Sequence, residues 1–146
     1  MKRYLSRMSA TSPQATSLGL LVLRLVAGGF MAVGHGLGKL RGGNASAFPD
    51  PLGIGSTLSY YGAVTSEVLC ASLVAAGLFT RLACLPLMFT MGVAALVVHG
   101  KDPLFMSGGT AKEPALIYLA MYVVILLCGP GRYSVDAGVL GRGSRP

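Results

Sequence analysis

The sequence predicts an all-α integral membrane protein whose four transmembrane helices form an antiparallel bundle. Its 146 residues are 53% hydrophobic and only 12% charged, which is too apolar for a water-soluble domain of this size. Four apolar stretches approach the roughly 20 residues that a helix needs to cross about 30 Å of hydrocarbon. Nearly all lysines, arginines and aspartates lie in the breaks between these stretches, as expected for loops that stay in water.

The four predicted spans cover residues 18–38, 57–79, 82–99 and 114–128. Their apolar residues do not alternate with a period of two, which argues against a transmembrane barrel. They also leave no broad polar face, which argues against helices lying on the membrane surface. The connection around Arg81 is minimal and predicts a tight hairpin between the second and third spans. Residues 41–55 and 100–113, rich in turn-forming residues, predict two longer loops.

The distribution of basic residues predicts that the chain crosses the cell membrane several times with both termini in the cytoplasm. Seven basic residues then lie on the cytoplasmic side and four on the outer side: Lys2, Arg3, Arg7, Arg81, Arg132, Arg142 and Arg145 against Lys39, Arg41, Lys101 and Lys112. The predicted organisation is a cytoplasmic tail (residues 1–17), a four-helix membrane domain (18–136) and a second cytoplasmic tail (137–146). The net charge of +7 suits contact with anionic lipid. The sequence has no basic stripe accompanied by aromatic residues, so no nucleic-acid partner is expected.

Two charged residues lie inside the predicted spans. An arginine at a helix centre costs about 2.5–3.5 kcal/mol on insertion scales, so Arg24 is expected to face the interior of the bundle. On a regular α-helix its face also carries Gly28, Met31, His35 and Gly38. Glu67 is the carboxylate inside the second span, and an Arg24–Glu67 ion pair is the structural hypothesis. Side chains lean toward the N-terminus of their own helix, and on antiparallel helices this lean moves Arg24 and Glu67 apart. The alternatives are that Arg24 snorkels to the membrane surface or that it faces a substrate.

Three further polar residues are expected at similar depth near the outer ends of the spans: His35, His99 and Glu113. Imidazoles can hydrogen-bond the carbonyls of a quinone, and with a carboxylate they can shuttle protons, so these residues are a candidate quinone headgroup site. A metal or haem site is an alternative, although no H-x-x-H or H-E-x-x-H spacing favours it and no metal is predicted. A purely structural alternative has the histidines anchoring helix ends and Glu113 capping the fourth helix.

The small residues and cysteines favour packing roles. Gly34 and Gly38 form a G-x-x-x-G pattern that can let helices approach closely. Cys70, Cys84 and Cys128 are scattered without a C-x-x-C motif, which argues against a thioredoxin-like mechanism and predicts that they are ordinary packing residues.

Three segments together resemble the DoxX family of small bacterial and archaeal membrane proteins: LRLVAGGFMAVGHGLGKL, GLFTRLA and GGTAKEPALIYLAMYVVILLCGPGRYSVD. The resemblance runs from about residue 18 to residue 136. Its most specific part is a structural terminal motif made of Gly129, Pro130, Gly131, Arg132, Ser134 and Asp136. In this motif Gly and Pro end a helix, Arg132 and Tyr133 suit the headgroup level, and Ser134 and Asp136 can bond the following backbone.

The resemblance implies a four-helix membrane protein in a family whose members include oxidoreductases and membrane subunits that handle thiosulfate, quinones or oxidative stress. Positions that recur in the family are matched by Arg24, His35, Glu67, Glu113 and Arg132. Three functions stay open: a quinone-linked redox subunit with quinone as its cofactor, a non-catalytic anchor for soluble redox enzymes, and a small transporter. Four helices enclose a narrow lumen, which disfavours a monomeric transporter, and a homo-oligomer would offer a wider path.

Overall fold

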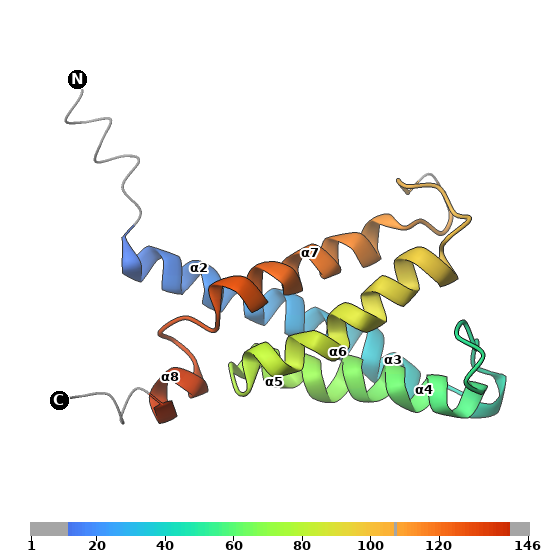
Figure 1. Ribbon diagram of the computed structural model, residues 1–146, viewed down its shortest axis with the longest axis horizontal. Helices are drawn as coiled ribbons and strands as arrows, with labels where there is room; N and C mark the ends of the chain where they lie inside the picture. Colours follow the sequence, from blue (N-terminus) through green and yellow to red (C-terminus); the bar gives the residue numbers. More distant parts are fainter. Residues whose placement is uncertain (1–11, 107, 141–146) are drawn as a thin grey trace, which may run out of the picture.

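The computed structural model describes residues 12–106 and 108–140, and this part of the chain is helical with no β-strand. Figure 1 shows the helices arranged as elongated rods, with the short helix α8 near the C-terminal end. The elements in chain order are α2 (Pro13–Phe30), η1 (Met31–Gly36), α3 (Leu37–Gly42), η2 (Ala45–Ala47), α4 (Ser56–Val64), η3 (Thr65–Cys70), α5 (Ala71–Ala76), α6 (Thr80–Val93), η4 (Ala94–Val98), α7 (Glu113–Cys128) and α8 (Val135–Leu140). Of these, η1, η3 and η4 are π-helical and η2 is a 3₁₀-helix.

Within the described residues, three rods are long and apolar enough to cross a membrane: Pro13–Gly42, Ser56–Ala76 and Thr80–Val98. The fourth, α7, is apolar but shorter, at 16 residues. The first rod begins ahead of the predicted residue 18 because Ser12 caps it, accepting a hydrogen bond from Ala15 N at 3.1 Å, and Pro13 suits the first helical turn. Residues 1–11 and 141–146, with most of the two predicted tails, lie outside the described residues, and the membrane orientation stays a prediction.

The rods run roughly antiparallel and define two ends of the bundle (Figure 1). The start of α2, the α5–α6 turn and α8 lie together at one end, here called the α8 end. Residues 43–55 lie at the other end, as do 99–106 and 108–112, and this is here called the loop end. The predicted tight hairpin is confirmed: α5 ends at Ala76, Gly77 turns the chain with φ +75°, and α6 begins at Thr80.

Small side chains let the rods pack closely, and large apolar side chains face outward. The buried cluster contains Ala27, Ala71, Ala83 and Ala95 together with Met31, Leu87, Tyr122 and Ile125. On the outer faces Phe30, Leu96 and Leu127 are 64%, 74% and 72% exposed. Apolar side chains exposed to this degree along whole rods would be unfavourable in water, so this distribution suits a bundle surrounded by lipid.

Each of the three long rods contains a π-helical segment, which changes the face that the following residues occupy. A π-turn holds more residues than an α-turn, so positions assigned with 3.6 residues per turn are rotated beyond it. Arg24, Gly28 and Met31 share a buried face as predicted, whereas His35 and Gly38 are exposed. Their assignment to the face of Arg24 is wrong because η1 begins at Met31, between the two groups.

Candidate functional site

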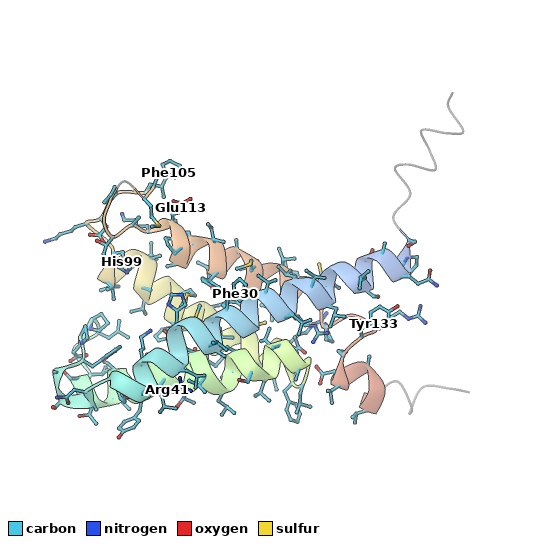
Figure 2. All side chains as sticks on the ribbon, turned by 180° about the vertical axis from the view of Figure 1, so that it is seen from behind. Phe30, Arg41, His99, Phe105, Glu113 and Tyr133 are labelled. Atoms are coloured by element: carbon cyan, nitrogen blue, oxygen red, sulfur yellow. The ribbon has the colours of Figure 1, made fainter. Side chains whose placement is uncertain are left out.

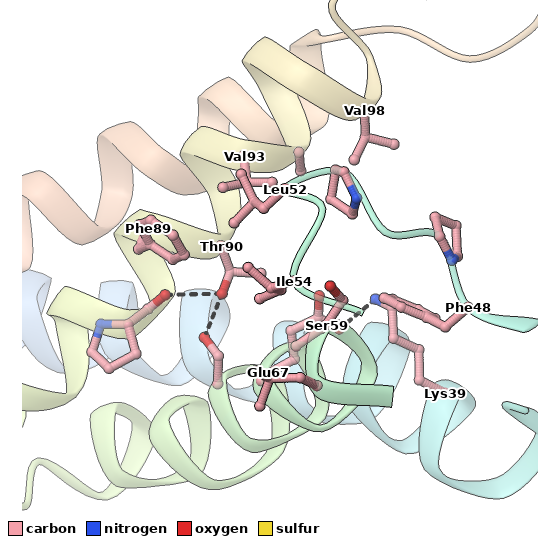
Figure 3. A pocket seen from close by; sticks show the side chains of 18 of the residues that line it. Lys39, Phe48, Leu52, Ile54, Ser59, Glu67, Phe89, Thr90, Val93 and Val98 are labelled. Atoms are coloured by element: carbon pink, nitrogen blue, oxygen red, sulfur yellow. Dashed lines mark hydrogen bonds and ion pairs between the residues drawn. The ribbon is translucent and has the colours of Figure 1, made fainter. Parts of the chain in front are cut away.

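A cavity of about 500 Å³ lies at the loop end, between the second and third rods and beneath residues 48–54 (Figure 3). Most of the side chains that line it are apolar: Phe48, Pro49, Pro51, Leu52, Ile54, Leu58, Ala63, Pro86, Phe89, Val93, Ala94 and Val98. The polar ones are Lys39, Ser59, Ser66, Glu67, Thr90 and His99. An apolar cavity with a few converging polar groups is typical of sites for small organic molecules.

Residues 48–54 are held over this loop-end pocket by Asp50. Its carboxylate accepts hydrogen bonds from Ile54 N at 3.0 Å, Gly55 N at 2.7 Å and Ser59 Oγ at 2.9 Å, which ties the segment to the first turn of α4. The hydrogen bond from Gly55 in particular holds the pKa of Asp50 below its ordinary value. The roof of the pocket is therefore anchored to one of its walls.

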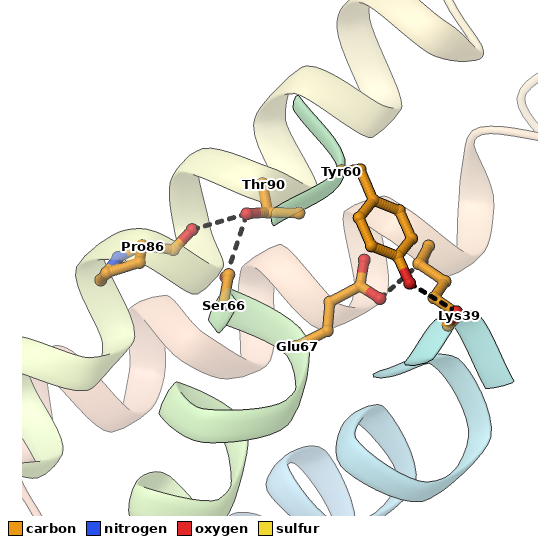
Figure 4. Close-up of polar contacts among 6 residues, drawn as sticks. All are labelled: Lys39, Tyr60, Ser66, Glu67, Pro86 and Thr90. Carbon is orange, nitrogen blue, oxygen red and sulfur yellow. Dashed lines mark hydrogen bonds and ion pairs between the residues drawn. The ribbon is translucent and has the colours of Figure 1, made fainter. Parts of the chain in front are cut away.

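The principal polar contact of the pocket is an ion pair between Lys39 Nζ and Glu67 Oε2 (Figure 4). The Glu67 side chain is only 5% exposed, whereas that of Lys39 is 31% exposed. Tyr60 donates its hydroxyl proton to the carbonyl of Lys39 at 3.0 Å and so ties α3 to α4. Gly36 also lets η1 lie against the backbone of η3, because an added Cβ would stand 2.8 Å from the carbonyl group of Glu67.

A second polar contact links the walls of the pocket. Thr90 Oγ1 lies 3.0 Å from Ser66 Oγ and 2.9 Å from the carbonyl of Pro86, so η3 is joined to α6 (Figure 4). The threonine has one hydroxyl proton and can donate to only one of these oxygens at a time. Both hydroxyl groups can therefore turn to suit a ligand.

His99 lines the pocket at the end of the third rod and is held by Asp102. Its Nδ1 lies 2.8 Å from Asp102 Oδ2. This hydrogen bond, with one from Thr110, outweighs burial and holds the pKa of Asp102 below its ordinary value. The Asp102 carboxylate accepts the proton on Nδ1, which leaves Nε2 of a neutral His99 as an acceptor.

The predicted outer site is only partly assembled. His99 and Glu113 both lie at the loop end, opposite Tyr133 (Figure 2). Glu113, however, accepts a hydrogen bond from Met106 N at 3.2 Å, and the exposed His35 ring meets Tyr118 edge-on with centroids 5.7 Å apart. Neither residue lines the pocket, and Glu113 begins α7 without capping it. The pocket thus combines His99 with Lys39 and Glu67 in place of the predicted trio.

Sequence reasoning missed Lys39, which counted only as a basic residue near a loop. The signal that could have found it is the lean of Glu67 toward the N-terminus of its own rod, which lies at the loop end where the first rod finishes. A lysine in the last turn of an apolar helix is also long enough to reach a carboxylate deeper in the bundle.

Arg24 does not pair with Glu67, and the predicted ion pair is wrong. Its guanidinium is fully buried at the α8 end, where Nη1 donates to the carbonyls of Val74 at 3.3 Å and Ala75 at 3.1 Å and Nη2 donates to that of Tyr133. The Nε atom has no hydrogen-bond partner. Because antiparallel helices point their side chains in opposite directions, Arg24 meets the end of α5 while Glu67 meets the end of α3.

The terminal motif closes the α8 end of the bundle. Asp136 caps α6, accepting hydrogen bonds from Phe79 N at 2.8 Å, Thr80 N at 3.0 Å and Thr80 Oγ1 at 2.8 Å. Its own N–H donates to the carbonyl of Gly77 at 2.8 Å. Ser134 accepts from Ala137 N at 3.1 Å, so it bonds the following backbone as predicted, whereas Asp136 turns to a distant helix.

We expect the cap made by Asp136 to weaken in acid. Burial raises the pKa of Asp136, but hydrogen bonds from Thr80 and Phe79 and the charge of Arg24 outweigh it, and the pKa is lowered overall. The contribution to stability is then complete above the unfolded pKa of about 3.9 and is lost as the pH falls through the lower folded value. Asp136→Asn should lower the free energy of unfolding by on the order of 1 kcal/mol at pH 7. Thermal unfolding in detergent should show that the difference in stability between Asp136→Asn and the unaltered protein disappears in acid. A difference in stability that does not depend on pH would contradict the assignment.

The remaining reactive residues lie outside this pocket. All three cysteines are free, with Cys84 buried in the core and Cys128 exposed. Arg132 lines a shallow hollow against the first turns of α2. In the described ranges no three His, Cys, Asp or Glu residues lie close enough together to hold a metal ion.

Comparison with known proteins gives one match. The sequence profile of the DoxX family matches residues 19–100, more than half of the chain. No curated protein and no solved structure matches. The matched segment contains Arg24, Lys39, Glu67 and His99, whereas the terminal motif lies beyond it. The chain therefore belongs to the DoxX family of membrane proteins.

Proposed function

We propose that this protein is a quinone-binding membrane subunit of a redox assembly and that the loop-end pocket is its quinone site. The observation that carries the proposal is the composition of the pocket, an apolar cavity of about 500 Å³ with the Lys39–Glu67 ion pair in its wall. A quinone has a flat ring, two oxygen atoms that need hydrogen-bond partners, and an apolar tail. The pocket supplies polar groups for the quinone oxygens and an apolar lining for the ring and the tail.

The polar residues of the pocket have distinct roles in this proposal. Lys39 donates to one ring oxygen, and the hydroxyl groups of Ser66 and Thr90 adapt to the bound molecule. His99, held by Asp102, is the one member of the predicted trio that contacts the headgroup. The chain binds and orients the quinone, and a soluble redox enzyme at the membrane exchanges electrons with it.

Filling the pocket should weaken quinone binding strongly. Gly62 lines the cavity, and an added Cβ there meets no atom within 4 Å, so Gly62→Phe can place its ring in the cavity without a backbone clash. We expect the affinity for decylubiquinone, measured by titration of the purified protein in lipid nanodiscs, to fall by roughly tenfold or more, which corresponds to about 1.4 kcal/mol.

The matched control is Gly19→Phe. Gly19 is also an exposed helical glycine with open space around it, but it does not line the pocket. This variant should bind the quinone as the unaltered protein does. The proposal is wrong if the unaltered protein shows no saturable binding, or if both variants bind equally well.

A further inference from the structure

The wall of the loop-end pocket presents a hydrogen-bond donor and an acceptor side by side. Lys39 carries three N–H groups, of which one is directed to Glu67 Oε2, and its partly exposed ammonium faces the cavity. Among residues 12–106 and 108–140, no hydrogen bond reaches the other carboxylate oxygen, Oε1. A ligand at this wall therefore meets a carboxylate oxygen of Glu67 that has no hydrogen-bond partner. Beside it lies the ammonium group of Lys39, which has further N–H groups to donate.

The two redox forms of a quinone differ in what they can offer to this wall. A quinone carbonyl only accepts, so it can bond Lys39 but leaves Oε1 without a donor once water is displaced. An unpaired carboxylate oxygen from which a ligand has displaced water, in an apolar site, is unfavourable. A quinol hydroxyl can accept from Lys39 and donate to Glu67 at the same time, so both groups are satisfied.

The other polar groups do not oppose this preference. Ser66 and Thr90 can rotate their hydroxyl protons and suit either form. The Nδ1 atom of His99 is engaged with Asp102, and in the tautomer that carries its proton on Nδ1 the Nε2 atom is a second acceptor that matches a hydroxyl. The wall thus presents hydrogen-bond acceptors that a quinone, which has no donor, cannot satisfy.

From this arrangement we propose that the pocket selects the quinol over the quinone, and that Glu67 is the residue that determines this selectivity. The inference rests on the proposed function, because it concerns the same site, and it specifies the redox form that is bound. It requires no electron transfer within this chain, since the difference arises in binding alone.

The test is an anaerobic titration of the purified protein in nanodiscs with three matched ligands: decylubiquinol, decylubiquinone and the dimethyl ether of the quinol. We expect the quinol to bind roughly tenfold more tightly than the quinone, a difference of about 1.4 kcal/mol. The dimethyl ether has the same ring and oxygens but no O–H group, so it should bind no better than the quinone.

Glu67→Gln tests the residue assignment. Its amide can donate to a quinone carbonyl, so the affinity ratio of quinol to quinone should fall toward one. Glu113→Gln is the matched control, because this second glutamate at the loop end lies outside the pocket lining, and it should keep the original ratio.

The outcomes separate the two proposals. If neither form binds, the proposed function itself is wrong. If all three ligands bind equally, the pocket remains a quinone site and the selectivity is overturned. An unchanged ratio in a folded Glu67→Gln overturns the role of Glu67, and if that variant does not fold, the three ligands still decide the selectivity on the unaltered protein.

Discussion

Replacing Arg24 by methionine should cause one of the two largest losses of stability in this protein. The substitution removes a fully buried guanidinium that donates to three carbonyl groups, one in a buried contact, Val74, and two in partly buried contacts, Ala75 and Tyr133. Val74 O also accepts from Gly77 N at 3.1 Å, but the carbonyl of Ala75, in the last turn of α5, loses its donor. A buried group left unsatisfied costs roughly 1–3 kcal/mol. Thermal unfolding in detergent, followed by circular dichroism, should show a large fall in melting temperature.

Arg81→Met is the matched control for this prediction. Arg81 also lies at the α8 end, but it is exposed and makes one long hydrogen bond, from Nη2 to the carbonyl of Leu127 at 3.4 Å. Its loss should change the melting temperature little. Arg24→Lys should be intermediate, because a lysine keeps the charge but not the planar fork that serves carbonyls in two segments. Equal melting temperatures for Arg24→Met and Arg81→Met would refute the structural role given to Arg24.

Gly28→Ala should be the second severe change, because it adds a single methyl group where two helices touch. A Cβ at this position would stand 2.5 Å from Ala71 O and 2.8 Å from Ala75 N. These are backbone atoms that cannot rotate away, so α2 and α5 must separate. Overpacking of this kind typically costs 1–3 kcal/mol, and here it also moves the carbonyls that Arg24 binds. The melting temperature in detergent measures the loss.

The adjacent glycine provides the control. An added Cβ at Gly29 meets no atom within 4 Å, and alanine favours a helix over glycine by about 1 kcal/mol. Gly29→Ala should therefore be as stable as the unaltered protein or more stable. If the two alanine variants lose the same stability, the close approach of α2 and α5 is not what requires glycine at residue 28.

The glycines show which helix contacts can be predicted from a sequence pattern in this chain. The sequence pattern pointed to Gly34 and Gly38 as the positions of close helix approach, yet both have open space around them. The close contacts occur at Gly28 and Gly36. A G-x-x-x-G motif indicates that a helix has a small face, but which helix lies against that face depends on the packing of the whole bundle.

The two intramembrane charges were found from the sequence, but their partners were not. Arg24 and Glu67 are both buried, as expected for charges inside apolar spans. Pairing them assumed that groups near the membrane centre meet. In the structure each leans toward its own helix N-terminus, so Arg24 binds backbone carbonyls at the α8 end and Glu67 binds Lys39 at the loop end.

The sequence by itself determined the membrane character of this protein, the approximate position of its four apolar helices and a tight hairpin between the second and third, whose turn lies at Gly77, a few residues ahead of Arg81. These properties follow from the hydrophobicity of consecutive residues and from local turn chemistry, which each segment carries on its own. Only the tertiary structure decided that Lys39 joins Glu67 and His99 in a pocket while His35 and Glu113 stay outside it. That outcome depends on π-turns, which rotate the helix faces, and on the opposite lean of side chains on antiparallel rods. Which rods become neighbours depends on contacts between residues far apart in the sequence.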